Sequence, residues 1–351
     1  MAGDGFYRRA SATQHGAAAA GLALIPATIA DVRVRGDGPP VLFADFGAAQ
    51  GNNSLEPIGR ALAALRAHAP QRAVYVVHAD IVGNDFTTLA SVLETAPDRY
   101  DLGDDHVLPL MSARSLYDRM FPAGELVFGW TASTLHWLRQ PPGPIADHFF
   151  VQRSSDAAAR ATYAAQSAQD WRHFLAARAF ELAPGASVVI VDVLMDENGV
   201  MGSERLFDLL NEVLARCRDD GRLTADEFAR IAYPTWFRSL DDLRAPFAPD
   251  YVSPSGARLE LVDLQPVVED DPFRSQLDDP QTYAASQAAF LRGFLEPSFA
   301  ASLDQSRRPQ ERERVLEAVW AATRDAIAAD PRAASPTYRL VSLRVRRARD
   351  R

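Results

Sequence analysis

VLFADFGAAQGNN, which spans residues 41–53, contains the pattern that decides the predicted fold. Its apolar start is typical of a buried parallel strand, and Asp45 follows at the carboxyl end of that strand. Gly47 and Gly51 enclose small residues, which let a backbone turn approach a ligand closely. An alanine- and leucine-rich helical pattern follows, from about Ser54 to His68. A strand, a glycine turn and a helix in this order predict the first unit of a doubly wound nucleotide-binding fold.

The glycine spacing narrows the class of ligand. Asp45, Gly47 and Gly51 form Asp-x-Gly-x-x-x-Gly, which differs from the G-x-G-x-x-G of dinucleotide enzymes. The spacing is closer to the first motif of S-adenosylmethionine (SAM) methyltransferases. On this stretch alone, a buried strand that ends in an ordinary tight turn stays an alternative.

Composition excludes several classes of function. The 351 residues suffice for one large domain or one domain with a cap, and 47% hydrophobic with 24% charged residues is ordinary for a soluble globular protein. A net charge of −9 does not favour a nucleic acid or an anionic membrane as partner. All 37 basic residues are arginine, which excludes a lysine Schiff base and a P-loop lysine. Cys217 is the only cysteine, so no disulfide can form within the chain.

The N-terminal region partly resembles an export signal. Arg8 and Arg9 precede an apolar stretch at 17–25, but polar residues, Gln14 and His15 among them, interrupt the pattern. No uninterrupted apolar stretch approaches the roughly 20 residues that cross a membrane. We therefore expect a cytoplasmic protein.

Strand and helix patterns alternate along the chain. A second apolar run, residues 73–79, ends at Asp80, which is placed to accept hydrogen bonds from two ribose hydroxyls, or alternatively serves as a helix cap. Asp85 is expected to cap the next helix. Further strands are predicted at 107–111, 126–130, 187–193, 258–264 and 338–345, and further helices at 163–183, 203–216, 224–231, 283–295 and 311–328. Pro184-Gly185 is expected to stop the first of these helices, and the last two helices are expected to flank the final strands. The alternation predicts a mostly parallel sheet.

Six segments, in order over most of the chain, resemble motifs of the SABATH methyltransferases, the salicylate, benzoate and theobromine group. The segments are Tyr7-x-x-x-Ser11-x-x-Gln14 and residues 45–52, 80–86, 115–122, 133–138 and 234–237. The chain is identified as a member of this family, and its alanine and arginine bias, which suggests a GC-rich genome, indicates a bacterial member.

The resemblance implies a Rossmann-like class I methyltransferase fold, a mostly parallel seven-stranded α/β sheet with an inserted helical cap. Residues 1–197 and 255–351 would form the SAM-binding core. Residues 198–254, where the strand rhythm lapses, would form the cap over the acceptor pocket, together with parts of 270–310. The cofactor would be SAM, which leaves as S-adenosylhomocysteine, and no metal would be required.

The resemblance also assigns roles to single residues. Gln14 and Trp137 would hold the carboxylate of the substrate as the catalytic pair. Ser133, His136 and Trp236 would line the rest of the acceptor pocket. The predicted SAM contacts are Ser11, Asp45, Gly47, Asn52, Asp80, Ile81, Ser115 and Leu116.

The chemistry of carboxyl methylation fits these residue types. A carboxylic acid with a pKa near ~4 is already ionised at neutral pH, so no general base is needed. The enzyme has to place one carboxylate oxygen in line with the methyl group. Gln14 and Trp137 offer neutral N–H donors that hold the anion without a counter-charge. Ser133 stands where many relatives carry tyrosine, and the extra space predicts a fatty or arylalkyl acid as substrate.

Other readings stay open at this point. The chain could methylate a ring nitrogen of a heterocycle, or bind SAM or a small acid without turnover. An NAD enzyme is disfavoured by the glycine spacing. We expect the chain to form a homodimer and to bind a small carboxylic acid as its substrate. We do not expect a nucleic acid or a membrane as a partner.

Overall fold

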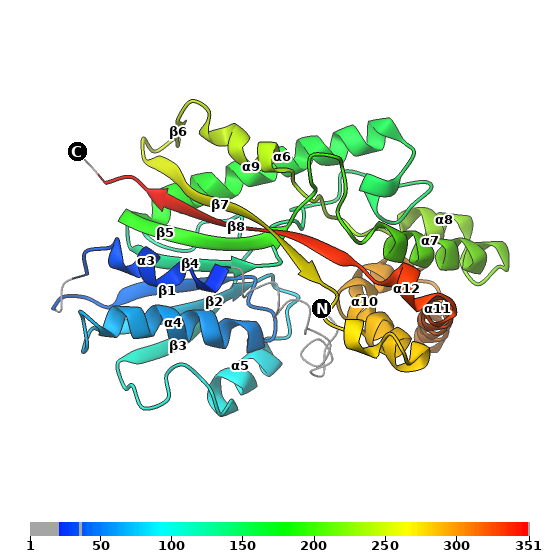
Figure 1. The fold of residues 1–351 in the computed structure, drawn as a ribbon, viewed down its shortest axis with the longest axis horizontal. Helices are drawn as coiled ribbons and strands as arrows, with labels where there is room; N and C mark the ends of the chain where they lie inside the picture. Colours follow the sequence, from blue (N-terminus) through cyan, green and yellow to red (C-terminus); the bar gives the residue numbers. More distant parts are fainter. Residues whose placement is uncertain (1–20, 35–36, 350–351) are drawn as a thin grey trace.

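The computed structural model describes residues 21–34 and 37–349. An eight-stranded sheet with the order β3-β2-β1-β4-β5-β8-β7-β6 forms the centre of the molecule (Figure 1). Five neighbouring strands are parallel: β1 (Val41–Phe46), β2 (Val74–Asp80), β3 (Val107–Ala113), β4 (Leu126–Ala132) and β5 (Leu182–Val193). Three antiparallel strands complete the sheet: β6 (Tyr251–Val252), β7 (Arg258–Asp270) and β8 (Thr337–Arg347). The predicted Rossmann-like α/β fold is therefore confirmed.

The strand count and the strand lengths differ from the prediction. The sheet has eight strands rather than seven because the short β6 pairs with β7 and forms the edge of the sheet. β7 and β8 are also longer than predicted, and they stay paired from Leu259↔Arg347 to Asp270↔Thr337. The charged residues that β7 carries near its end hid this extension, since they break the apolar pattern of a strand.

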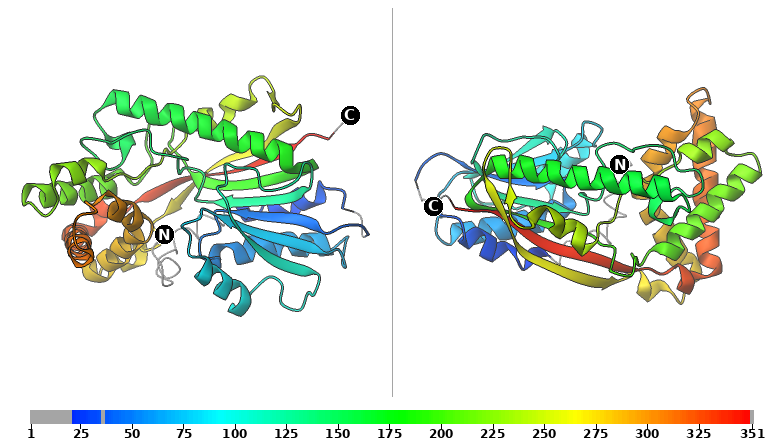
Figure 2. Two further views of the ribbon diagram at one scale, coloured as in Figure 1. Left: turned by 180° about the vertical axis from the view of Figure 1, so that it is seen from behind. Right: turned by 90° about the horizontal axis from the view of Figure 1, so that it is seen from above.

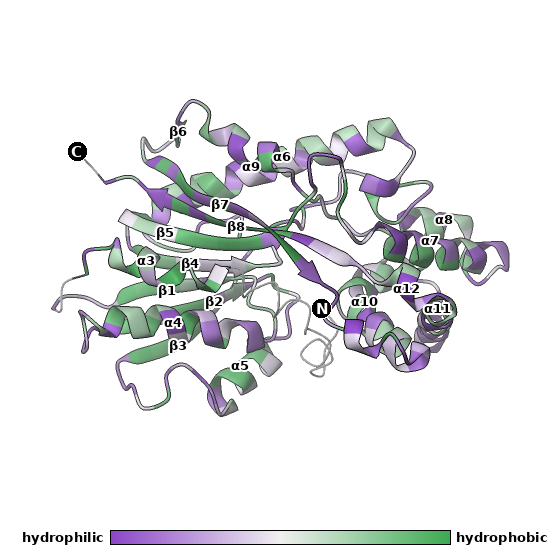
Figure 3. Ribbon diagram, in the orientation of Figure 1, coloured by the Kyte–Doolittle hydropathy of each residue, from purple (hydrophilic) through white to green (hydrophobic). Residues whose placement is uncertain are grey.

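Helices cover both faces of the sheet (Figure 2). α3 (Ile25–Ala30) and α4 (Leu55–Arg66) lie on one face, and α6 (Ala157–Glu181) lies on the other. α5 (Phe86–Thr95) packs through Leu89 against Leu55 at the start of α4. In Figure 3 the ribbons of β1 and β5 are mainly hydrophobic, whereas the helices carry both colours, as expected for a buried sheet beneath amphipathic helices.

α6 starts earlier and ends earlier than the sequence predicted. Asp156 caps its start by accepting hydrogen bonds from the N–H groups of Ala158 and Ala159. Its last residue is Glu181, and β5 begins directly at Leu182, so Pro184-Gly185 lies inside the first part of the strand rather than after the helix. The predicted cap of α5 is confirmed, because the Asp85 side chain accepts from the N–H of Thr88.

A second hydrophobic cluster holds a group of helices beyond the carboxyl ends of the parallel strands (Figure 1). Its helices are α7 (Glu204–Asp219), α8 (Ala225–Arg230), α10 (Pro280–Ser302), α11 (Pro309–Ala329) and α12 (Pro331–Ala334). α11 packs against both α7 and α10. α10 and α11 therefore belong to this group of helices, whereas the sequence predicted that they flank β7 and β8. We call these five helices the cap.

The packing differs from the predicted division of the chain at two places. The short helix α9 (Leu240–Arg244) lies in the segment predicted for the cap, but Leu243 packs in the hydrophobic core of the sheet. The indole N–H of Trp171 on α6 donates to the Leu243 carbonyl at 3.2 Å. Conversely, α11 contributes Val319 and Trp320 to the cap cluster, although its residues were predicted for the core.

Within residues 21–34 and 37–349, no helix is long and apolar enough to cross a membrane.

Candidate active site

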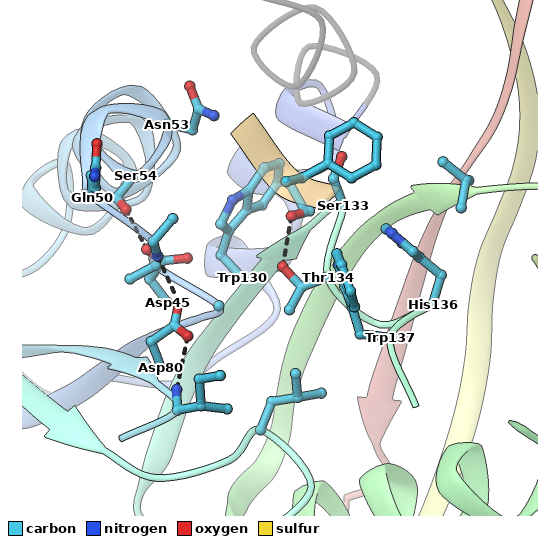
Figure 4. A pocket seen from close by; sticks show the side chains of 18 of the residues that line it. Asp45, Gln50, Asn53, Ser54, Asp80, Trp130, Ser133, Thr134, His136 and Trp137 are labelled. Carbon is cyan, nitrogen blue, oxygen red and sulfur yellow. Dashed lines mark hydrogen bonds between the residues drawn. The ribbon is translucent and has the colours of Figure 1, made fainter. Parts of the chain in front are cut away.

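A cavity of about 560 Å³ lies where β1, β2 and β4 end and reaches to α10 in the cap. Figure 4 shows its two ends: Asp45 and Asp80 lie on one side, His136 and Trp137 on the other, and Ser133 and Thr134 lie between them. We call the first the glycine-turn end and the second the cap end. Among the described residues, every predicted cofactor contact lines this cavity: Asp45, Gly47, Asn52, Asp80, Ile81, Ser115 and Leu116.

The turn after β1 requires glycine at position 47. Gly47 has φ 84°, and a Cβ there would lie 2.3 Å from the Thr134 Oγ1 atom. The N–H groups of Gly47 and Ala48 both donate to the carbonyl of Ala79 in β2, at 2.8 and 3.1 Å. The absence of a side chain thus lets the ends of three strands meet at the cavity.

Asp80, at the end of β2, is held by two backbone donors. Its Oδ2 accepts from the N–H of Ala49 and its Oδ1 from the N–H of Ile81, both at 2.8 Å. Burial raises the pKa of Asp80 above its ordinary value, although these two hydrogen bonds act in the opposite direction. Each carboxylate oxygen has a further lone pair, so the fixed group can accept two hydroxyl donors.

Asp45 belongs to a buried chain of three side chains, which we call the β1 network: Asp45, His78 and Tyr100. The Nδ1 of His78 lies 3.3 Å from Asp45 Oδ2, and its Nε2 lies 2.8 Å from the Tyr100 hydroxyl. The Ser54 hydroxyl also donates to Asp45 Oδ2. Burial, followed by the charges of Asp101 and Asp45, raises the pKa of Tyr100 above its usual range. Tyr100 therefore keeps its proton and can donate to His78.

Contacts with α6 hold the segment that carries Ser115 and Leu116 in place. Arg178, fully buried, donates to the Leu116 carbonyl at 2.9 Å and pairs with Glu181 on the same helix. The hydroxyl of Tyr117 lies 3.0 Å from the Leu135 carbonyl and 2.6 Å from the Trp137 carbonyl. This contact joins the glycine-turn end of the cavity to the cap end.

A second buried chain of three side chains lies at the cap end. We call it the β5 network: Asp192, His136 and Tyr233. His136 Nδ1 lies 2.6 Å from Asp192 Oδ1, and His136 Nε2 lies 3.0 Å from the Tyr233 hydroxyl. His136 and Tyr233 line the cavity.

Trp137 lines the cavity, but the side chain of Trp236 does not lie in the described lining. The segment around Trp137 pairs antiparallel with Thr235, and Trp236 N–H donates to the His136 carbonyl at 3.0 Å. Trp236 packs beside Leu138, Ile145, Val151 and Tyr163. Tyr233 lies in the lining instead, and the contact predicted between Trp236 and the substrate stays a prediction.

Sequence reasoning also missed the aromatic wall of the cap end. Phe290 and Phe294 of α10 line it, and the Phe294 ring lies 5.3 Å from the Tyr233 ring. Tyr338 of β8 and Glu269 of β7, which pair in register, line it as well. These positions are separated by more than thirty residues in the chain from the recognised motifs, and only the packing of α10 on the strand pair brings them together.

Two predicted site residues, Ser11 and Gln14, lie outside the described residues. Ser133 and His136 line the cavity as predicted for their positions, and Ser133 has φ 52°. No group of three or more potential metal-ligating side chains occurs in the part of the chain that the structure describes. The roles of individual residues in binding stay predictions.

The comparisons with known proteins agree on one family. A family model described as SAM dependent carboxyl methyltransferase matches residues 2–321. Methyltransferase LUC1 of Fusarium sp is 27% identical over 295 residues, which are 82% of this chain and 77% of that protein. The 3,7-dimethylxanthine N-methyltransferase CkTbS of Camellia sinensis var. assamica is 24% identical over 279 residues, 74% of this chain and 72% of that protein.

A solved structure of loganic acid methyltransferase with SAH has the same fold. Its TM-score is 0.78 at 17% identity, and the match covers 99% of this chain and 98% of that one. The two sequence relatives come from a fungus and a plant, so they do not support the expected bacterial source.

Proposed function

Because the chain belongs to the SAM dependent carboxyl methyltransferase family, we propose that it transfers a methyl group from SAM to the carboxylate of a small acid and so forms a methyl ester. The cofactor of this methyltransferase is SAM. The observation that carries the proposal is the single cavity, which joins the fixed carboxylates at the glycine-turn end to the indole of Trp137 at the cap end. One cavity with two chemically different ends suits a transfer between two bound molecules.

The glycine-turn end fits SAM. Asp80 would accept hydrogen bonds from the two ribose hydroxyls, since both its oxygens are fixed by backbone donors. Asp45, Gly47, Asn52, Ile81, Ser115 and Leu116 would surround the rest of the molecule. When bound, SAM supplies an electrophilic methyl group on a positively charged sulfur.

Trp137 would hold the acid. Its indole N–H is a donor that cannot accept, so it favours a carboxylate oxygen. Its backbone is fixed by Tyr117 and by pairing with Thr235, which limits how the acid can turn. Gln14 would provide the second donor. The acid is ionised at neutral pH, so these residues need only orient it and exclude water.

The cap end favours an apolar acid. Phe290, Phe294 and Tyr233 form an aromatic wall, which would bury a chain or a ring. The carboxylates of Glu269 and Asp270 also line this end, and they would repel a second anionic group on the substrate. We therefore propose a fatty or arylalkyl monocarboxylic acid.

One observation favours a second candidate, methylation of a ring nitrogen. Such a reaction has to release a proton, and the β5 network connects the cavity to a buried histidine that can take one. CkTbS, one of the relatives, is named as an N-methyltransferase. A protein that binds SAM without turnover is the third candidate.

The experiment is incubation of the protein with SAM that carries a labelled methyl group and a mixed library of acids and heterocycles. Mass spectrometry should find labelled methyl esters of apolar acids. Labelled N-methyl products without esters would favour the second candidate, and absence of any labelled product despite SAM binding would favour the third.

A cytoplasmic location and a homodimer also belong to this proposal. Sedimentation of the full chain should give twice the 38.4 kDa of one chain.

A further inference from the structure

We propose that Tyr117 is a positioning residue that couples the binding of the cofactor to the binding of the acid. The inference rests on the proposed carboxyl methylation and deepens it, because SAM would order the segment that holds the substrate. It follows from the contacts of Tyr117 on two sides: with the turn at Ser115, and with the segment that carries Trp137.

The turn on the cofactor side lies between β3 and β4, outside any helix or strand. The N–H of Tyr117 lies 3.3 Å from the Ser115 Oγ, and the N–H of Asp118 donates to the Ser115 carbonyl at 2.9 Å. Ser115 and Leu116, which would contact SAM, line the cavity. A cofactor bound against these two residues would restrict the turn, and with it the position of Tyr117.

The hydroxyl of Tyr117 makes the contact on the substrate side. It lies 2.6 Å from the Trp137 carbonyl and 3.0 Å from the Leu135 carbonyl, and burial raises the pKa of Tyr117 above its usual range, so the proton stays. The Leu135 carbonyl has a second donor, Arg238 Nη1, at 2.8 Å. Within residues 21–34 and 37–349, the Trp137 carbonyl has no donor other than Tyr117. The single proton of Tyr117 is therefore needed at Trp137.

Few other contacts fix the backbone of Trp137. Its N–H donates to the Thr134 carbonyl at 3.1 Å, and an isolated bridge pairs it with Thr235. When the bond from Tyr117 is made firm, the indole that would hold the carboxylate has less freedom left to lose, so the acid binds more tightly. Thermodynamic linkage then requires that the acid strengthen cofactor binding by the same factor.

The test uses S-adenosylhomocysteine (SAH), which fills the cofactor site but has no methyl group to transfer. Calorimetry on the full chain measures the Kd of octanoate and of 3-phenylpropanoate, with and without saturating SAH. In the wild type, SAH should lower the Kd of the acid by at least about 5-fold, the lower end of ordinary coupling between two sites. Each acid should lower the Kd of SAH by the same factor.

The Tyr117→Phe variant keeps the ring that lines the cavity and removes only the hydroxyl. It should reduce the coupling factor by about 3- to 10-fold, the effect of one neutral hydrogen bond, or to one where the wild-type factor is smaller. A purely structural role of the hydroxyl would weaken acid binding equally with and without SAH, and the factor would not change.

Tyr163→Phe is the matched control. The Tyr163 hydroxyl is also bonded to a backbone carbonyl, that of Gly143 at 2.8 Å, but Tyr163 lies outside the cavity lining. This variant should keep the wild-type coupling factor.

A second measurement, on the wild type, decides even if the Tyr117→Phe variant does not fold. The N–H groups of Trp137 and Leu138 donate to the carbonyls of Thr134 and Pro234. SAH alone, without acid, should slow hydrogen exchange at these two N–H groups.

Three outcomes overturn the inference: equal acid affinity with and without SAH, an unchanged coupling factor in folded Tyr117→Phe, and unchanged exchange at Trp137 and Leu138. Each leaves the proposed carboxyl methylation standing as long as labelled methyl esters form. If neither acid binds in either state, the proposed substrate class is wrong and the inference is refuted with it.

Discussion

The β1 network and the β5 network contain the same residue types in the same order, but they face the cavity in opposite directions. In the β1 network Asp45 lines the cavity, and His78 and Tyr100 lie behind it. In the β5 network Tyr233 and His136 line the cavity, and Asp192 lies behind them. One arrangement thus presents a carboxyl group to the cavity, and the other presents an imidazole and a phenol with the carboxyl group behind them.

The difference matches the two ligands of the proposed reaction. A carboxylate at the glycine-turn end suits hydroxyl donors and a positively charged cofactor, whereas the β5 network keeps its own carboxylate, that of Asp192, behind His136 and Tyr233. In both networks the histidine Nδ1 faces the aspartate and Nε2 faces the tyrosine. Orientation relative to the cavity, rather than composition, therefore separates their roles. The following predictions test this distinction.

The largest effect is expected at the glycine-turn end. Asp80→Ala should weaken SAM binding by about 1.5–3 kcal/mol, the scale of a lost charged hydrogen bond. Glu269→Ala, which removes a carboxylate from the cap end, is the control and should leave SAM affinity unchanged. Calorimetry on both variants measures the difference. Unchanged SAM affinity in a folded Asp80→Ala protein would show that Asp80 does not contact the ribose.

The pKa of Asp80 adds a dependence on pH. Burial raises this pKa above the ordinary value of about 3.9. The ionised form accepts both hydroxyl donors, so SAM affinity should be full above the raised pKa and should fall as the pH drops through it. In Asp80→Ala, the fall of SAM affinity at low pH should disappear. If the SAM affinity of the wild type falls only at the pKa of an ordinary aspartate, the expected effect of the raised pKa is contradicted.

An effect on folding should appear behind the cofactor. Tyr100→Phe leaves the buried Nε2 of His78 without its donor, so the free energy of unfolding should fall by about 1–3 kcal/mol. Because Tyr100 lies outside the cavity lining, the KM for the acid should not change. Denaturant titration and steady-state kinetics measure the two quantities. A changed KM for the acid would mean that the two networks are not independent.

Ser133→Tyr should shift the preferred length of the acid. The added ring would fill space at the cap end, and each methylene no longer buried costs about 0.8 kcal/mol. Ser133→Ala is the matched control, since position 133 has φ 52° and both replacements must adopt the same backbone. The measurement is kcat/KM over a chain-length series. The same optimum in all three proteins would show that the space beside Ser133 is not used.

The smallest effect is expected for the pH dependence of turnover. At saturating acid, kcat should be flat over roughly pH 6.5–8.5, since the substrate is already ionised and needs no base. A steep limb near neutrality that disappears in His136→Gln would identify His136 as a base. It would favour the N-methyltransferase reading.

The sequence predicted the glycine-turn end well because its parts are local. Strand β1, the turn at Gly47 and the acid at the end of β2 each follow from a few neighbouring residues. Since parallel strands end at the same edge of a sheet, the topology alone brings Asp45 and Asp80 together.

The cap end could not be predicted in the same way. Whether Tyr233 or Trp236 lines the cavity depends on the tight turn in which the Thr235 N–H donates to the Tyr233 carbonyl, and on the pairing of Thr235 with Trp137. Phe290 and Phe294 reach the cavity only because α10 packs on the cap cluster. No local pattern records these long-range contacts.

The long pairing of β7 and β8 has a consequence for how the substrate range of such a chain can evolve. The two strands stay paired from the sheet to the cap with one register shift between Leu261 and Asp263, and Glu269 and Tyr338 are partners beside the cavity. Beyond that shift the register is regular, so an insertion or deletion of one residue there would turn every later side chain of β7 to the opposite face. Replacement of single side chains is therefore the accessible route to a new substrate here, whereas a change of length would need a second irregularity in the pairing or a loop beyond the paired strands.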